Sequence, residues 1–360
     1  MAAGRPRQRL LRRRALAPGG RTEKSDTAAA PLTAVPSGLT ADDLRRLYRY
    51  MLLQRFAEDR IVKLYYQGAI VGACFTGYGH EAIAVGAAYA LGPQDVAATL
   101  HRDLGARLVL GMPLRYYFAN FLGRTGSPTR GREGNLHIGG LGPRILLHID
   151  HIGASIPVAA GAALGFTVRR DARVAMAFFG EGTLATGEFH EGANLAAVLR
   201  LPLVLVCWNN QFAYSTPVHR EVAGPLVDRM AGYGMDACSV DGNDVLAVYE
   251  AARRAVNRAR ERNGPSFLEC RTMRMRGHSE ADDASYVPKA LIEEWRRRDP
   301  VDRLEKYLAE TGLLPAAQGE ALRAAVLAEV DEAQAWAEAC PPPDPAELEH
   351  GVYCEGQPWP

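Results

Sequence analysis

The sequence of 360 residues contains no run of the roughly 18 to 20 uncharged apolar residues that a membrane span requires, so we expect no membrane insertion. Cysteine is also scarce, and none of the six stands in the close pairs typical of a zinc site or a disulfide-rich fold. The sequence therefore predicts neither of these, and it indicates a reducing compartment. The six are Cys74, Cys207, Cys238, Cys270, Cys340 and Cys354.

Basic side chains are few outside the N-terminus. Seven arginines precede Glu23, the first acidic residue, and removing them from the 42 basic side chains leaves 35 against 41 acidic ones. A mildly acidic body argues against nucleic acid as the main partner, because such binding needs a basic surface on the folded domain. The seven are Arg5, Arg7, Arg9, Arg12, Arg13, Arg14 and Arg21.

Residues 1–37 combine these arginines with Ala, Gly, Pro and Thr, a composition that cannot bury enough apolar surface to offset the entropy of ordering. We expect a flexible tail there and a cytoplasmic protein. An Arg-rich, acid-poor start also fits an organelle transit peptide, which would place the protein in the mitochondrial matrix.

The rest of the chain alternates short apolar runs, rich in Val, Ile and Phe, with Ala-rich helical stretches. This rhythm predicts an α/β fold, a mostly parallel sheet with helices on both faces, over residues 38–287. A charged, amphipathic C-terminal helical region of the same domain is expected over 288–340, followed by an irregular tail over 341–360. The expected strands are 96–100, 173–179, 203–208, 237–240 and 266–273.

The most informative stretch is one βαβ unit over residues 173–210. Glu181 follows its first strand and Asn210 follows its second, and a right-handed crossover brings such neighbouring strand ends together. With a carbonyl from the next turn, these oxygens suit Mg²⁺, which takes its remaining ligands from phosphate and water. Gly180 and Gly182 would let backbone amides at a helix start approach a diphosphate closely.

These residues stand as GEG and, about thirty residues later, WNN, and so the sequence resembles the alpha subunits of the thiamine-diphosphate-dependent 2-oxo acid dehydrogenases. The resemblance extends over residues 39–314 and implies the thiamine-diphosphate-binding fold. It implies that Glu181, Asn210 and the carbonyl of Phe212 hold Mg²⁺, while Gly182 and Thr183 line thiamine diphosphate. The glutamate in GEG is a variant found in branched-chain members of the family.

Three further segments carry the resemblance. In His101-Arg102-Asp103, which follows a predicted strand, Arg102 resembles the arginine that pairs with the diphosphate, and His101 is expected to contact the cofactor too. Asp103 could instead claim Arg102 in a local ion pair.

The stretch Arg276-Gly277-His278-Ser279 resembles the loop over the active-site channel, and it makes His278 the expected catalytic residue, also near the cofactor. Ser279 is a candidate phosphorylation site. Ile152 resembles the aliphatic support of the aminopyrimidine, although its segment fits a plain helix start nearly as well.

The family implies a reaction in which a 2-oxo acid is decarboxylated and its acyl group passes to a lipoyl carrier. It also implies partners: a beta subunit, giving two alpha and two beta chains and needed for activity, and a lipoyl acyltransferase core. Pyruvate is the favoured substrate, with branched-chain 2-oxo acids and acetoin as alternatives. Phe75 stands where many pyruvate-type members have histidine, and Trp208 where branched-chain members have a phosphate-binding arginine.

Two readings from other classes remain open. Gly180, Gly182 and Ala185 also satisfy the dinucleotide pattern G-x-G-x-x-A, which would make the protein an NAD-binding oxidoreductase. That pattern expects an acidic residue at the end of the next strand, where this chain has Asn209 and Asn210. A noncatalytic assembly subunit is the other alternative.

Overall fold

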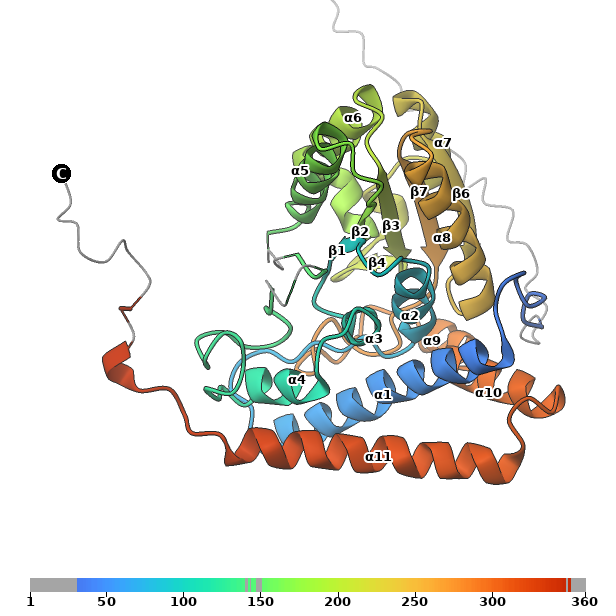
Figure 1. Ribbon diagram of the computed structural model, residues 1–360. Helices are drawn as coiled ribbons and strands as arrows, with labels where there is room; N and C mark the ends of the chain where they lie inside the picture. The colour runs from blue at the N-terminus through green and yellow to red at the C-terminus, as the bar shows by residue number, and fades with distance from the viewer. Residues whose placement is uncertain (1–30, 140–141, 143, 147–150, 348, 351–360) are drawn as a thin grey trace, which may run out of the picture. The chain divides into compact units, whose positions relative to one another are not determined.

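The computed structural model describes residues 31–139, 142, 144–146, 151–347 and 349–350, and a five-stranded parallel sheet lies at its centre (Figure 1). All five predicted strands are confirmed, within two residues at either end. In sheet order they are β1 (Val96–Ala98), β2 (Ala175–Gly180), β3 (Leu203–Asn209), β7 (Ser266–Arg271) and β6 (Asp236–Asp241).

Helices cover both faces of the sheet, as predicted. Successive residues of a strand point to opposite faces, and accordingly Met176 and Phe178 of β2 enter one core cluster while Ala177 and Phe179 enter another. Figure 1 shows α5 and α6 on one side of the strands and α8 on the other. The buried residues of β2 and β3 are almost all apolar, which is typical of strands covered on both faces.

The first core is closed by α1 (Ala41–Tyr66), α2 (Glu81–Tyr89), α3 (Leu104–Val109), α4 (Leu114–Phe121) and α8 (Val245–Arg260). The second is closed by α5 (Ser155–Val168), α6 (Gly187–Val198) and α7 (Leu226–Met230). Short 3-10 turns are η1 (Glu181–Ala185), η2 (Val218–Arg220), η3 (Ala231–Tyr233) and η4 (Pro345–Glu347).

The predicted C-terminal helical region consists of α9 (Lys289–Arg296), α10 (Pro300–Glu310) and α11 (Ala316–Ala339). Helix α11 packs along α1 and α4. Buried ion pairs tie α10 to the rest of the domain, because Arg55 of α1 lies 2.6 Å from Glu81 of α2 and 3.0 Å from Asp299, which caps α10.

Local sequence sets the helix ends. Thr40 begins α1 with a capping box, in which its hydroxyl accepts from the amide of Asp43 (3.2 Å) and the Asp43 carboxylate accepts from the amide of Thr40 (2.9 Å). Asp244 caps α8 and also accepts a hydrogen bond from the amide of Thr33 (2.7 Å). The flexible tail over 1–37 stays a prediction, because residues 1–30 lie outside the described ranges.

Two features of the described residues relate to the predictions drawn from composition. No helix there is long and apolar enough to cross a membrane. Five cysteines are free thiols, and Cys354 lies outside the described residues. The free ones are Cys74, Cys207, Cys238, Cys270 and Cys340.

Candidate functional site

Glu181 and Asn210 meet at the carboxyl ends of β2 and β3, as their spacing predicts. Gly180, the last residue of β2, pairs in register with Trp208 near the end of β3. The backbone amide of Asn210 donates to Glu181 Oε2 over 3.2 Å. The two residues that carry the metal hypothesis therefore lie in direct contact.

The Glu181 carboxylate is buried, and only one of its oxygens is satisfied. Oε1 has no hydrogen-bond partner among the described residues. Burial raises the pKa of Glu181 to about 7, although the amide of Asn210 and the charge of Arg274 act in the opposite direction. A buried carboxylate with a free oxygen is suited to a cation that would replace its lost hydration.

The turn after Asn210 has an unusual backbone. Gln211 and Tyr214 adopt left-handed conformations, with φ of 73° and 52°. Gln211 precedes β4 (Phe212–Ala213), and Tyr214 lies in the turn between β4 and β5 (Thr216–Pro217), a short hairpin that periodicity did not predict. Asn210 Oδ1 accepts from the amide of Phe212 at 3.4 Å. The hairpin thereby holds the Phe212 carbonyl near the Glu181–Asn210 pair.

Arg274, which follows β7, is a site residue that sequence reasoning missed. Its guanidinium is buried and donates to the carbonyls of Phe212 (3.1 Å) and Tyr214 (2.7 Å). A carbonyl oxygen has two lone pairs, so this bond orients the Phe212 oxygen and leaves one lone pair for a metal. Position past the end of a strand is the one signal that could have pointed to Arg274.

The two glycines of the fingerprint have different surroundings. A Cβ on Gly182 would lie 2.6 Å from that of Ala213, so this position requires glycine for close packing of η1 on the hairpin. A Cβ on Gly180 would meet no protein atom within 4 Å. Gly180 thus borders open space, and Thr183 is buried beside it in η1.

The expectation that a helix begins at these glycines is wrong. They lead into the 3-10 turn η1, and α6 begins at Gly187, where the Thr186 hydroxyl caps the helix through the amide of Phe189 (3.3 Å). The dinucleotide pattern also needs a helix that opens at the glycines, and so this geometry departs from it.

Arg102 is buried, and its guanidinium is held by backbone carbonyls. It donates to the carbonyl of Thr76 (2.8 Å) and to that of His278 (2.6 Å). Burial lowers the pKa of Arg102 to about 9. The local pairing of Arg102 with Asp103 does not occur, because Asp103 pairs with Arg107 at 3.0 Å. Arg102 therefore remains suited to a phosphate.

The predicted residues His101 and His278 both pack against Phe75, and their own ring centres lie 6.4 Å apart. The Phe75 ring centre is 5.0 Å from that of His101 and 5.3 Å from that of His278, and it lies 5.5 Å from the Arg102 guanidinium carbon. The structure therefore brings Arg102, His101 and His278 together, with Phe75 as the apolar centre of the group.

His278 is fixed by its own loop. Its amide donates to Asp282 Oδ2 (2.6 Å), which also accepts from the Tyr286 hydroxyl (2.5 Å). Tyr286 in turn accepts from Arg274 (2.6 Å), so Arg274 links this loop to the hairpin. Burial, followed by the charges of Arg102 and Arg274, lowers the pKa of His278 to about 4, and the imidazole is neutral near pH 7.

Ile152 is 63% exposed. The adjoining Gly153 approaches the start of α6 so closely that a Cβ there would lie 2.6 Å from the hydroxyl of Thr186, the N-cap of that helix. Residues 147–150 lie outside the described ranges. Trp208 points away from the edge into the core, where its ring centre lies 5.3 Å from that of His80.

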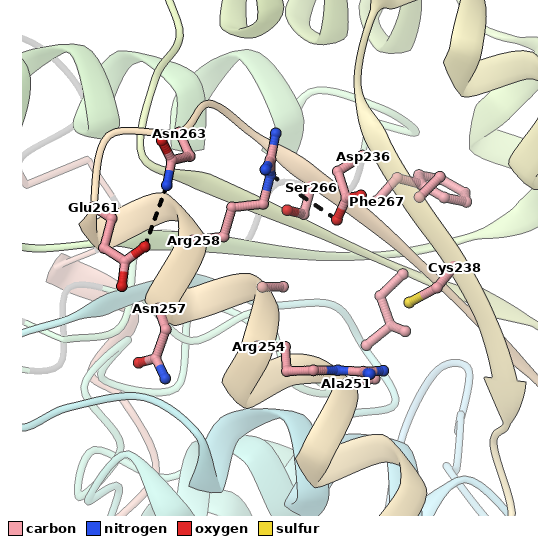
Figure 2. A pocket seen from close by; sticks show the side chains of 13 residues that line it. Asp236, Cys238, Ala251, Arg254, Asn257, Arg258, Glu261, Asn263, Ser266 and Phe267 are labelled. Carbon is pink, nitrogen blue, oxygen red and sulfur yellow. Dashed lines mark hydrogen bonds and ion pairs between the residues drawn. The ribbon is translucent and has the colours of Figure 1, made fainter.

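Two cavities among the described residues lie away from the Glu181–Asn210 edge. One of about 520 Å³ lies between α8 and the beginnings of β6 and β7, at Asp236 and Ser266 (Figure 2). Because the strands are parallel, their beginnings lie at the opposite edge of the sheet. A second cavity, of about 460 Å³, borders the His278 loop and is lined by Ser279 and Arg276.

A metal site made only of His, Cys, Asp and Glu is absent from the described residues. The set proposed from the sequence is of another kind, since it combines a single carboxylate with an amide oxygen and a backbone carbonyl. Such a set suits Mg²⁺, which is usually held by one or two carboxylates together with phosphate oxygens and water.

Comparison with known proteins identifies the family of the chain. Residues 48–346 match the family described as dehydrogenase E1 component. The chain is 36% identical over 324 residues to the 2-oxoisovalerate dehydrogenase subunit alpha of Bacillus subtilis, a match that covers 88% of this chain and 97% of that protein.

Two other relatives are similar at nearly the same level. The pyruvate dehydrogenase E1 component subunit alpha of Zymomonas mobilis is 35% identical over 337 residues, 91% of this chain and 95% of that protein. The subunit alpha of acetoin:2,6-dichlorophenolindophenol oxidoreductase from Bacillus subtilis is 34% identical over 317 residues, 88% and 95% respectively. The three relatives carry different substrates in their names, and so the identities do not select one.

Proposed function

The chain belongs to the dehydrogenase E1 component family as the alpha subunit of a thiamine-diphosphate-dependent 2-oxo acid dehydrogenase, and on this premise we propose that it decarboxylates pyruvate and passes the acetyl group to a lipoyl domain, whose disulfide is reduced. The contact between Glu181 and Asn210 carries the proposal, because it leaves a buried carboxylate oxygen free at the carboxyl edge of the sheet.

In this proposal Mg²⁺ binds to Glu181, to the side-chain oxygen of Asn210 and to the carbonyl of Phe212. The open space beside Gly180 and the close turn at Gly182 leave room for the diphosphate. The remaining groups assigned to the cofactor are Thr183, Arg102, His101 and Ile152, of which Ile152 is the least supported because of its exposure.

Thiamine diphosphate, when bound, would supply the nucleophilic carbon and the electron sink that decarboxylation of a 2-oxo acid needs. The task of His278 follows from its surroundings. An arginine only donates hydrogen bonds, so the approach of Arg102 Nη2 to His278 Nδ1 (3.4 Å) leaves the proton of the neutral ring on Nε2. From Nε2 the neutral ring can donate a hydrogen bond to a reacting oxygen during acyl transfer.

An apolar outer face of α5 and α6 supports the proposal of a beta subunit. Helix α5 has no charged residue, and a helix apolar on all sides is normally buried. Yet Val168 of α5 and Val198 of α6 are 74% and 70% exposed. Val158 of α5, and Leu195 and Leu199 at the end of α6, are exposed as well. We propose that the beta subunit covers this face in an assembly of two alpha and two beta chains.

A binding experiment tests this function against its rivals. Calorimetry with thiamine diphosphate and with NAD, each with and without Mg²⁺ and the co-expressed beta chain, should show Mg²⁺-dependent binding of thiamine diphosphate alone. Binding of NAD without Mg²⁺ would support an oxidoreductase of another kind, and binding of the partner but no cofactor would support an assembly subunit. Full turnover by the alpha chain alone would contradict the need for a beta subunit.

Pyruvate is proposed because the rings near His278 are crowded. The centre of the Tyr214 ring lies 4.6 Å from that of His278 and the centre of the Phe75 ring 5.3 Å from it, and we expect this crowding to disfavour a branched acyl group. Assays of the reconstituted complex on pyruvate, 3-methyl-2-oxobutanoate and acetoin should favour pyruvate. Phe75→Ala should narrow its advantage over the branched substrate by about tenfold, since one or two methylenes decide such preferences.

The lipoyl acyltransferase and the compartment are further parts of the proposal. A lipoyl domain should accept the acetyl group from the reconstituted complex, whereas free lipoamide alone should serve poorly. We place the protein in the cytoplasm, with the mitochondrial matrix as the alternative if the Arg-rich start is a transit peptide. N-terminal sequencing of the mature protein distinguishes the two.

A further inference from the structure

Gln54 is a polar side chain in an apolar part of α1. Its neighbours Met51, Leu52 and Leu53 belong to the core, and Gln54 itself is fully buried. Burying an amide is unfavourable unless its hydrogen bonds are satisfied. A leucine would pack better among these apolar neighbours, so the buried amide indicates a specific structural role.

The Gln54 amide joins two segments that are distant in sequence. Its Nε2 lies within hydrogen-bond distance of the carbonyls of Arg102 (3.3 Å) and Gly77 (3.5 Å), and its Oε1 accepts from the amide of Gly105 (2.9 Å). Glu58, one turn further along α1, completes the connection. Its Oε1 accepts from the amide of Gly77 (3.0 Å) and from Gln54 Nε2 (3.2 Å).

Two glycines make room for this arrangement. A Cβ on Gly105 would lie 2.4 Å from Gln54 Oε1, and one on Gly77 would lie 2.1 Å from the carbonyl oxygen of Arg102. The two segments therefore approach as closely as bare backbone allows. Segment 76–77 also provides the Thr76 carbonyl that holds the Arg102 guanidinium (2.8 Å).

We propose that Gln54 and Glu58 are a positioning pair, which fixes both the backbone of Arg102 and the carbonyl that anchors its guanidinium. The inference rests on the proposed function, in which Arg102 faces the cofactor diphosphate. Burial, with the charge of Glu81 acting in the same direction, raises the pKa of Glu58 well above its ordinary range. Neither residue is among those assigned to the cofactor, so the pair acts by orienting the Arg102 guanidinium.

The test compares thiamine diphosphate with thiamine monophosphate, which lacks the outer phosphate. Calorimetry with Mg²⁺ on the full chain, in complex with its beta subunit, gives the affinity for each and hence their ratio. Gln54→Met should lower the ratio of diphosphate affinity to monophosphate affinity by about tenfold. This is the effect of losing one hydrogen bond that orients a charged group.

Asn120→Leu is the matched control. Asn120 is an equally buried amide in α4, bonded to the carbonyl of Asn135 (2.8 Å) and to Ser127 (2.9 Å) rather than to the Arg102 segment. This variant should lose thermal stability but keep the affinity ratio. An equal fall of the ratio in Asn120→Leu, or an unchanged ratio in Gln54→Met, would overturn the positioning pair.

Glu58 gives a second comparison if Gln54→Met does not fold. Glu58→Gln keeps the Oε1 acceptor and should stay within about twofold of the wild-type ratio, whereas Glu58→Leu should behave like Gln54→Met. Arg102→Met separates the two levels of the proposal. If it lowers the ratio while Gln54→Met does not, the positioning pair alone is wrong; if it leaves the ratio unchanged, the phosphate assignment of Arg102 fails and the inference with it.

Discussion

Replacing Glu181 with glutamine should stabilise the metal-free protein while it removes Mg²⁺-dependent cofactor binding. Glutamine has nearly the same shape, and its side-chain oxygen can still accept from the amide of Asn210, as Glu181 Oε2 does at 3.2 Å. What it lacks is the buried negative charge. Because the stability of the metal-free protein should rise while the cofactor affinity falls, the variant tests whether the Glu181 carboxylate serves to bind a cation.

The size of the stability effect follows from the pKa. Burial raises the pKa of Glu181 from its ordinary 4.5 to about 7, so between these values the folded state keeps a proton that the unfolded state has released. Stability from this group is therefore present below the lower value and is lost as the pH rises through the higher one. At about 1.4 kcal/mol per pKa unit, the loss above pH 7 is about 3 kcal/mol.

Urea unfolding of the protein in chelator measures this difference. Glu181→Gln should exceed the wild type in free energy of unfolding by up to about 3 kcal/mol near pH 8 and by almost nothing near pH 4. Calorimetry with thiamine diphosphate and Mg²⁺ should show at least a tenfold loss of affinity. Glu191→Gln, an exposed position on α6, serves as the control and should change neither quantity.

Two results would refute the reasoning. If Glu181→Gln destabilises the metal-free protein near pH 8, then the carboxylate has a stabilising partner within the fold and is not reserved for a cation. If the variant keeps Mg²⁺-dependent affinity for thiamine diphosphate, then Glu181 is not a metal ligand.

Three further predictions test the surroundings of the site. Gly182→Ala should lower thermal stability by about 1 to 3 kcal/mol, because its Cβ would lie 2.6 Å from the nearest one, whereas Gly180→Ala, which meets no protein atom within 4 Å, should lower cofactor affinity at unchanged stability. Asp299→Asn should cost about 1 to 3 kcal/mol in chemical unfolding, because Arg55 loses one charged partner and keeps the other, Glu81; a near-neutral change would contradict that pairing. His278→Gln should reduce kcat of the reconstituted complex by about a hundredfold or more, and, because the pKa of His278 is lowered to about 4, the wild type should lose more stability than the variant as the pH falls from about 6.5 to 4.

The elements that the sequence predicts correctly are those whose signal is local. The inner strands β2 and β3 are nearly continuous apolar runs, as a strand buried on both faces requires. The contact of Glu181 with Asn210 follows from one βαβ unit, in which the crossover rule places the two strand ends side by side. The hairpin of β4 and β5 escaped prediction because two-residue strands have no periodicity to read.

The supporting residues are of a different kind, because their positions depend on sheet order. β7 lies next to β3 although β6 comes between them in sequence, and the pairing of Asn209 with Arg271 is what brings Arg274 beside the hairpin after Asn210. The spacing of these residues along the chain does not indicate that β3 and β7 are neighbours in the sheet. Gln54 is likewise placed by the packing of α1 under two loops.

Arg274 shows how such a support can act on two parts of the site at once. It donates to the Phe212 carbonyl on one side and, through the Tyr286 hydroxyl, to Asp282, which holds the amide of His278. A metal that drew on the Phe212 carbonyl would compete with Arg274 for its electron density and so weaken that hydrogen bond. Metal binding would then alter the hydrogen bonds of the His278 loop. Arg274 would thereby connect metal binding at the Glu181–Asn210 edge to the ordering of the loop that carries the proposed catalytic residue.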